Sequence, residues 1–116
     1  MTESLPDFLP KLQKHHGIYV VRRTYEGTCA FLAGYELGSG DRVLKEFHGW
    51  LVERERGRPE LYWPLLVLCE IYEDGALPDL RYFTPAQDEE AVGVLFRLLD
   101  VFFESHGMVD RGRSVS

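Results

Sequence analysis

The segment from Thr84 to His106 constrains the fold of this chain more than any other stretch, because it carries the signals of one long helix. Thr84 is a favoured N-cap residue, and Pro85 follows at the first helical position, where a missing N–H costs nothing. Gln87 completes a capping-box pattern, and Gly107 is a natural stop. Apolar residues then recur at helical spacing, namely Val92, Leu95, Phe96, Leu99, Phe102 and Phe103. We expect the other segments to pack against this stripe.

Further segments also have the apolar spacing of helices, so we expect four to five helices in all. They span residues 5–14, 25–37 and about 42–55. Thr24 and Asp41 are the expected N-caps of the second and third, whereas Pro10 is a difficulty for the first because it removes a helical hydrogen bond. Gly34 weakens its helix by about 1 kcal/mol relative to alanine, which suggests that a ring or backbone packs closely there. Residues 18–21 are rich in β-branched side chains and are expected to be an extended connector.

Residues 61–72 are ambiguous between helix and strand. Trp63, Leu66 and Val67 fit a buried helix, and this is the interpretation that we favour. The Asp74-Gly75 turn signal and a possible returning strand instead suggest a β-hairpin at about 65–83. The expected fold is therefore mostly α, with α+β as the alternative. We expect one globular domain over residues 1–107 and a flexible tail over 108–116.

Composition sets the broad class of the protein. A chain of 116 residues buries roughly two-thirds of its unfolded surface and needs neither disulfide nor metal to fold. Cys29 and Cys69 lie in apolar segments, which favours buried thiols over a disulfide. The first residues lack a basic start followed by an apolar run, and no apolar run reaches the ~20 residues that a bilayer requires. We expect a cytoplasmic protein.

The charge of the chain is unevenly distributed. The net charge is -6, whereas residues 1–52 are neutral overall and residues 53–104 carry twelve Asp and Glu against five Arg. An acidic half argues against nucleic acid as its partner, because phosphate binding needs a basic patch. It suits a basic protein partner, since opposite fields speed encounter. The competing explanation is that acidic surfaces merely keep proteins soluble.

The sequence lacks the common catalytic and metal-binding motifs. There is no His-Glu-x-x-His, Cys-x-x-Cys or Gly-x-Ser-x-Gly, so we expect a protein without catalytic activity, cofactor or metal site. The alternative is a small enzyme or a ligand- or metal-binding domain with an acidic site built from Glu70, Glu73 and His48, since paired carboxylates serve acid–base work and bind hard cations. A third hypothesis is a homo-oligomeric structural subunit.

Fifteen aromatic residues are more than a small helical core usually requires. Exposed tyrosine beside arginine is typical of protein interfaces, although tyrosine also lies at core edges with its hydroxyl in water. Together with the acidity, this predicts a partner-binding surface in the second half of the chain. Its expected residues are Glu70, Tyr72, Glu73, Asp74, Tyr82, Asp88, Glu89 and Glu90.

Several spacings resemble those of a family of short, uncharacterised bacterial proteins, some of which look like immunity proteins that neutralise a toxin of the same cell. The stretches that carry the resemblance are Phe31-Leu32-Ala33-Gly34-Tyr35, Phe47-x-x-Trp50-Leu51, Trp63 before Leu65–Leu68, and Asp88-Glu89-Glu90-Ala91 leading to Leu95 and Phe102. The family's Arg-Pro-Gly-Met-Tyr-x-Gly motif is altered here to His-His-Gly-Ile-Tyr-Val-Val at 15–21. The resemblance implies an inhibitor of a toxin. The acidity of the second half suggests that this toxin is basic, and the inhibitor would act by blocking that partner's active surface.

Overall fold

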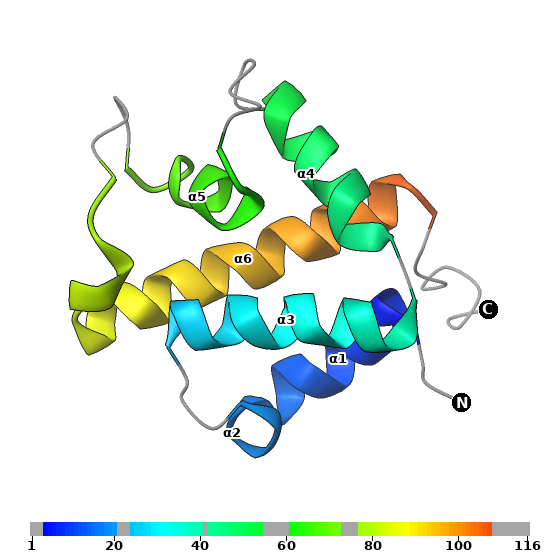
Figure 1. Cartoon of the computed structure of the whole chain (residues 1–116), viewed down its shortest axis with the longest axis horizontal. Coiled ribbons are helices and arrows are strands. Elements are labelled where there is room, and N and C mark those ends of the chain that lie inside the picture. Colours follow the sequence, from blue (N-terminus) through cyan, green and yellow to red (C-terminus); the bar gives the residue numbers. More distant parts are fainter. Residues whose placement is uncertain (1–3, 21–23, 41, 55–60, 73–76, 108–116) are drawn as a thin grey trace.

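The longest helix, α6 (Pro85–Ser105), crosses the molecule and contacts three of the other helices (Figure 1). The computed structural model describes residues 4–20, 24–40, 42–54, 61–72 and 77–107. These residues are mostly helical and contain no β-strand, which confirms the expected fold class. The remaining elements are α1 (Leu5–Lys14), α2 (His16–Tyr19), α3 (Tyr25–Ser39), α4 (Val43–Arg54), α5 (Trp63–Leu68) and the short 3₁₀ helix η2 (Leu80–Tyr82).

The start of α6 has the capping box that its sequence predicts. The Thr84 hydroxyl accepts a hydrogen bond from the Gln87 backbone N–H at 3.1 Å, and the Gln87 side-chain oxygen accepts one from the Thr84 N–H at 2.8 Å. Two backbone donors that have no partner within the helix are thereby satisfied. At the other end the chain leaves the helix through Gly107, whose φ of +65° suits a residue without a side chain.

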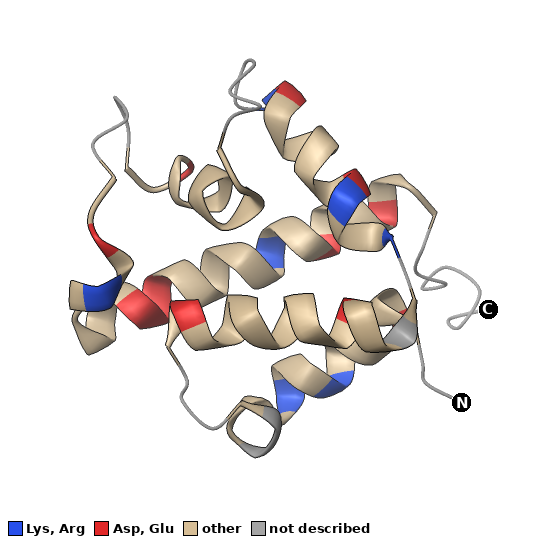
Figure 2. Ribbon diagram, viewed as in Figure 1, with Lys and Arg blue, Asp and Glu red and all other residues tan. Residues whose placement is uncertain are grey.

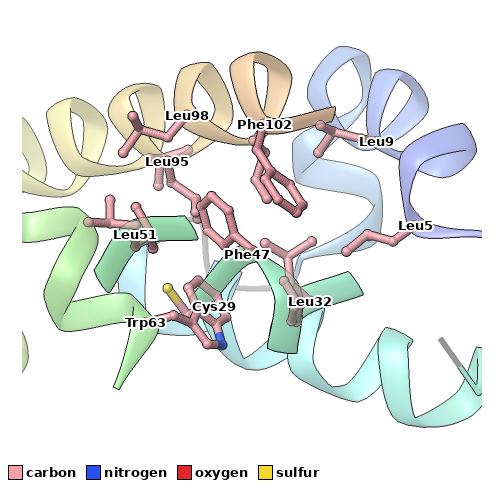
Figure 3. Close-up of a cluster of buried hydrophobic side chains, with 14 of the residues drawn as sticks. Leu5, Leu9, Cys29, Leu32, Phe47, Leu51, Trp63, Leu95, Leu98 and Phe102 are labelled. Atoms are coloured by element: carbon pink, nitrogen blue, oxygen red, sulfur yellow. The ribbon is translucent and has the colours of Figure 1, made fainter. Parts of the chain in front are cut away.

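The apolar stripe of α6 is buried against α3, α4 and α5, and α1 packs beside α3. Phe47 of α4 lies at the centre of this core, with its ring 5.4 Å from that of Phe102 and 6.0 Å from that of Trp63 (Figure 3). Leu95 and Leu98 of α6 point into the same cluster. The stripe predicted from sequence is confirmed apart from Phe96, which is half-buried.

Helix α1 runs through Pro10 without ending. Pro10 lies on the exposed side of the helix, and its missing N–H deprives only the Pro6 carbonyl of its usual partner. The helix is anchored by its apolar side, where Leu5, Leu9 and Leu12 are buried. Burial of this face therefore outweighs the loss of one hydrogen bond.

Two expectations for the first half of the chain are wrong. The connector expected at 18–21 is in part helical, since His16–Tyr19 forms α2 after a non-helical turn at His15; Val20 is buried, and Val21 lies outside the described residues. This turn lets the His16 ring reach the Thr28 hydroxyl at 2.8 Å. A Cβ atom added at Gly34 would meet no atom within 4 Å, so no close internal packing explains this glycine.

The segment after α4 is helical where the structure describes it. Trp63–Leu68 forms α5, with Pro64 in its first turn, and residues 69–72 continue as turns. The hairpin alternative for 65–83 is therefore not borne out by the described residues, and η2 takes the place of its returning strand. The acidic turn residues Glu73 and Asp74, the expected cap Asp41 and the tail at 108–116 lie outside the described residues.

A carboxylate from another helix is bound at the start of α4. The Glu36 side chain of α3 accepts a hydrogen bond from the Leu44 N–H at 2.6 Å. A carboxylate is favourable there because it meets an unpaired donor and the positive end of the helix dipole. None of the helices in the described ranges combines the length and apolar character that crossing a bilayer requires.

Candidate functional site

Helices α3 and α6 begin at the same end of the molecule, where one hydrogen bond joins them (Figure 1). The Asp88 carboxylate in the first turn of α6 accepts from the Tyr25 N–H, the first residue of α3, at 2.9 Å. Thr24 satisfies a second donor of α3, because its hydroxyl accepts from the Gly27 N–H at 3.0 Å. Asp88 is half-buried and acts as an N-cap for a helix other than its own.

Tyr25 also connects this end to α5 and η2. Its hydroxyl donates a hydrogen bond to the Pro64 carbonyl, and its ring centroid lies 6.4 Å from that of Phe83. The side chain is fully buried, and this burial raises the pKa of the phenol well above its ordinary value. Tyr25 therefore fixes the relative positions of the elements that carry the surface acids.

The acids around this junction form what we call the acidic end, defined by Glu26, Asp88, Glu89 and Glu90 (Figure 2). Glu26, Glu89 and Glu90 are exposed, so their charges reach solvent. Tyr82 of η2, which lies shortly before α6 in the chain, exposes 77% of its surface. Sequence reasoning missed Glu26 because it belongs to the half of the chain that is neutral overall; only the fold brings it to the start of α6.

An open cavity of about 580 Å³ with a mixed polar and apolar lining lies beside the acidic end. Its lining combines residues of α6 with the starts of α2 and α3, namely His16, Thr24, Pro85, Asp88, Glu89, Val92 and Gly93. The carboxylate of Glu89 is exposed there, while Asp88 is already bonded to Tyr25. The cavity therefore has negative charge at its rim and room for a long polar side chain.

Not every nearby acid adds to this field. Asp79 lies 2.7 Å from the Arg81 guanidinium, whose hydrogen bonds lower the pKa of that carboxyl to about 2. Glu70, which the sequence predicted as a partner contact, is half-buried and bonded by two nitrogens of Arg54 at 3.0 and 3.1 Å. Both carboxylates are therefore locally neutralised.

The structure brings together only part of the predicted partner-binding set. Asp88, Glu89 and Glu90 share the first turns of α6, and Tyr72 approaches them, with its hydroxyl 3.5 Å from the Gln87 amide nitrogen. Tyr72 is half-buried, whereas Tyr82 is exposed. Glu70 is held by Arg54 as described above. Glu73 and Asp74 fall outside the described residues.

The alternative site of Glu70, Glu73 and His48 is not assembled by the described residues. The Nε2 atom of His48 lies 2.9 Å from the Leu61 carbonyl, so this nitrogen carries the proton and donates it. Glu70 is bonded to Arg54, and Glu73 is not among the described residues. Within the described ranges, no three His, Cys, Asp or Glu side chains are grouped as metal ligands would be.

Neither cysteine forms a disulfide, as the sequence predicted. Cys29 of α3 is buried, and this burial raises the pKa of its thiol to about 12, against a smaller lowering effect of a hydrogen bond with Tyr25. The thiolate is the nucleophilic form of cysteine. Cys29 is therefore protonated near neutral pH and is not in the nucleophilic thiolate form. Cys69 is half-buried.

Comparisons with protein-family models, curated proteins and solved structures gave no match.

Replacing Asp88 by alanine should lower the free energy of unfolding by about 1–2 kcal/mol, because the Tyr25 N–H loses its acceptor and the two helix starts lose their link. The matched control is Glu89→Ala, which removes an exposed carboxylate from the same turn and should change stability by less than about 0.5 kcal/mol. Urea unfolding followed by circular dichroism measures both. Equal effects of the two substitutions would contradict the capping role of Asp88.

The free energy of unfolding should also fall between pH 8 and pH 10 by ~1–2 kcal/mol more in the native chain than in a Cys29→Ala variant. The unfolded thiol ionises near pH 9, whereas the folded thiol holds its proton to about pH 12. The unfolded chain thus binds fewer protons over this interval, and rising pH favours it. Urea unfolding measures both pH profiles. Parallel profiles for the two proteins would show that burial does not suppress ionisation of the Cys29 thiol.

Proposed function

We propose that this chain is a non-enzymatic protein-binding domain that contacts a basic protein through its acidic end. The observation that carries the proposal is the gathering of three exposed carboxylates, Glu26, Glu89 and Glu90, at one rigid junction of two helices. A concentrated field of one sign accelerates encounter with an oppositely charged partner and suppresses wrong partners. The arrangement is fixed by the buried side chain of Tyr25 and by its hydrogen bond to the half-buried Asp88, so little reordering is needed on binding.

The geometry of the acidic end suggests how a partner would be held. The cavity of about 580 Å³ beside Glu89 would accept a lysine or arginine side chain, which would meet the carboxylate at the rim. Tyr82 supplies an exposed aromatic ring close in sequence to these acids, and rings of this kind often anchor protein interfaces. The charges would then set the association rate, and the ring would lengthen the lifetime of the complex.

The resemblance to immunity-type proteins supports a more specific version of this proposal. The basic partner would be a toxin, and the domain would inhibit it by covering its active surface. The acidic stretch Asp88-Glu89-Glu90-Ala91 is part of that resemblance and also supplies two of the three exposed carboxylates. An inhibitor of this kind needs no catalytic group of its own.

The partner is first to be captured from lysate at low salt and released at high salt, and its association rate then measured by stopped flow. The variant carrying Glu89→Lys and Glu90→Lys should associate at least about tenfold more slowly than the native chain, with a weaker dependence on salt. The control carries Glu46→Lys and Glu53→Lys, two exposed acids of α4, and so has the same net charge. Equal rates for the variant and the control would refute binding through the acidic end.

A further inference from the structure

Helix α3 has an outer face that the rest of the described chain leaves uncovered. Ala30, Gly34 and Leu37 are exposed along it, and Leu37 exposes 85% of its surface. The helix carries only two charged residues, Glu26 and Glu36, among its 15. A helix that is apolar on all sides is usually covered on all sides. Nothing within the described residues requires glycine at position 34, whereas a second helix packed there would.

Beside this face lie two cavities that share part of their lining, and we call them together the groove. One, of about 360 Å³, is almost entirely apolar and is lined by residues that include Cys29, Ala30, Ala33, Tyr62, Pro64 and Leu65. The other, of about 400 Å³, shares Ala33 and Tyr62 with it and is also lined by Leu37 of α3 and by Lys45 and His48 of α4. Tyr62, which lines both cavities, exposes 60% of its surface. The face thus offers both a protruding apolar side chain, Leu37, and an apolar cavity.

The exposed charges at the two ends of the groove differ in sign. Glu26 lines the apolar cavity at one end. Lys45 lines the other cavity at the opposite end, together with Glu36, whose carboxylate already accepts a hydrogen bond from the Leu44 N–H. Glu26 and Lys45 are both exposed residues. The distance along α3 from Glu26 to Leu37 is about 16 Å, or three helical turns. A surface with an acid at one end and a base at the other is complementary to itself when a copy is turned end for end.

We propose that the occupant of this groove is the same face of a second copy of this chain, in a two-fold symmetric dimer with the two α3 helices antiparallel. Leu37 of each subunit would enter the apolar cavity of the other, and Glu26 of each would meet the partner subunit's Lys45. The small residues Ala30, Ala33 and Gly34 would lie near the symmetry axis, where they allow the two helix backbones to approach closely. In a two-fold interface each contact between the subunits occurs twice, once on either side of the symmetry axis.

The dimer would leave the first turns of α6 uncovered, since Glu89 and Glu90 lie outside the groove lining. Glu26 of each acidic end would be paired with the partner subunit's Lys45, so the dimer would display Glu89 and Glu90 from both copies, which would raise the avidity for a partner with repeated basic sites. The inference does not depend on the proposed function, because self-association is measured on the purified chain alone.

Sedimentation equilibrium across a dilution series tests the dimer directly. The native chain should show a reversible monomer–dimer equilibrium, and Leu37→Glu should weaken association at least about 100-fold, since it places a charge in an apolar cavity. Leu37 is exposed in the monomer, so circular dichroism should show the variant folded. The control, Val101→Glu, alters another exposed apolar residue, on α6, and should leave association unchanged.

A charge swap tests the antiparallel arrangement. Glu26→Lys and Lys45→Glu should each weaken the dimer about tenfold, and the double variant should restore most of the native association, since the opposite charges meet again. A chain that stays monomeric at every concentration would overturn the inference. So would a dimer that survives Leu37→Glu, or a double variant as weak as the single reversals.

Discussion

The burial of one side of α6 is the interaction on which the rest of this structure depends. Helices α3, α4 and α5 all contact α6, and α1 is tied to it by a hydrogen bond of 3.1 Å from Gln13 to Asp100. The rings of Phe47 and Phe102 meet in the middle of this core. Large buried side chains of this kind contribute most of the favourable free energy in a small domain. The other helices are short, and helices of such length are marginal without tertiary packing.

Carboxylates complete the framework by capping helices to which they do not belong. Asp88 of α6 accepts from the start of α3, and Glu36 of α3 accepts from the start of α4. Each bond fixes the separation of two helix ends while satisfying a backbone donor. The consequence for function is direct, because Asp88 holds Glu26 and Glu89 at one junction. The acidic end therefore contributes to the packing of the helices through Asp88, and it also presents negative charge at the surface.

Local signals in the sequence were sufficient to predict much of the fold. The cap at Thr84, the stop at Gly107 and the stripe through Leu95 and Phe102 depend on residues a few positions apart, and the structure confirms them. The bond between Asp88 and Tyr25 joins residues 63 positions apart, and no local pattern marks it. For the same reason the sequence assigns Asp88 to the partner-binding surface and gives no sign of its bond to Tyr25.

The candidate site was harder to predict than the helices. Glu89 and Glu90 were expected at the surface and are exposed, but Glu70 lies in reach of Arg54 only because α4 packs against α5. No signal in the sequence assigns Leu37 and Tyr62 to one exposed face, since spacing does not show which side of an apolar helix stays uncovered. The sparse charge of α3 was the one signal that could have pointed to its outer face.

Native-state amide hydrogen exchange is the measurement that tests the central role of α6 most directly. Amides in the second half of α6, from Leu95 to Phe102, should exchange only through global unfolding and should be the slowest in the molecule. Those of α2 and η2 should exchange faster through local opening, because these elements are short and lie at the periphery. If α6 opened separately while α1, α3 and α4 stayed protected, the account of α6 as the organising helix would be contradicted.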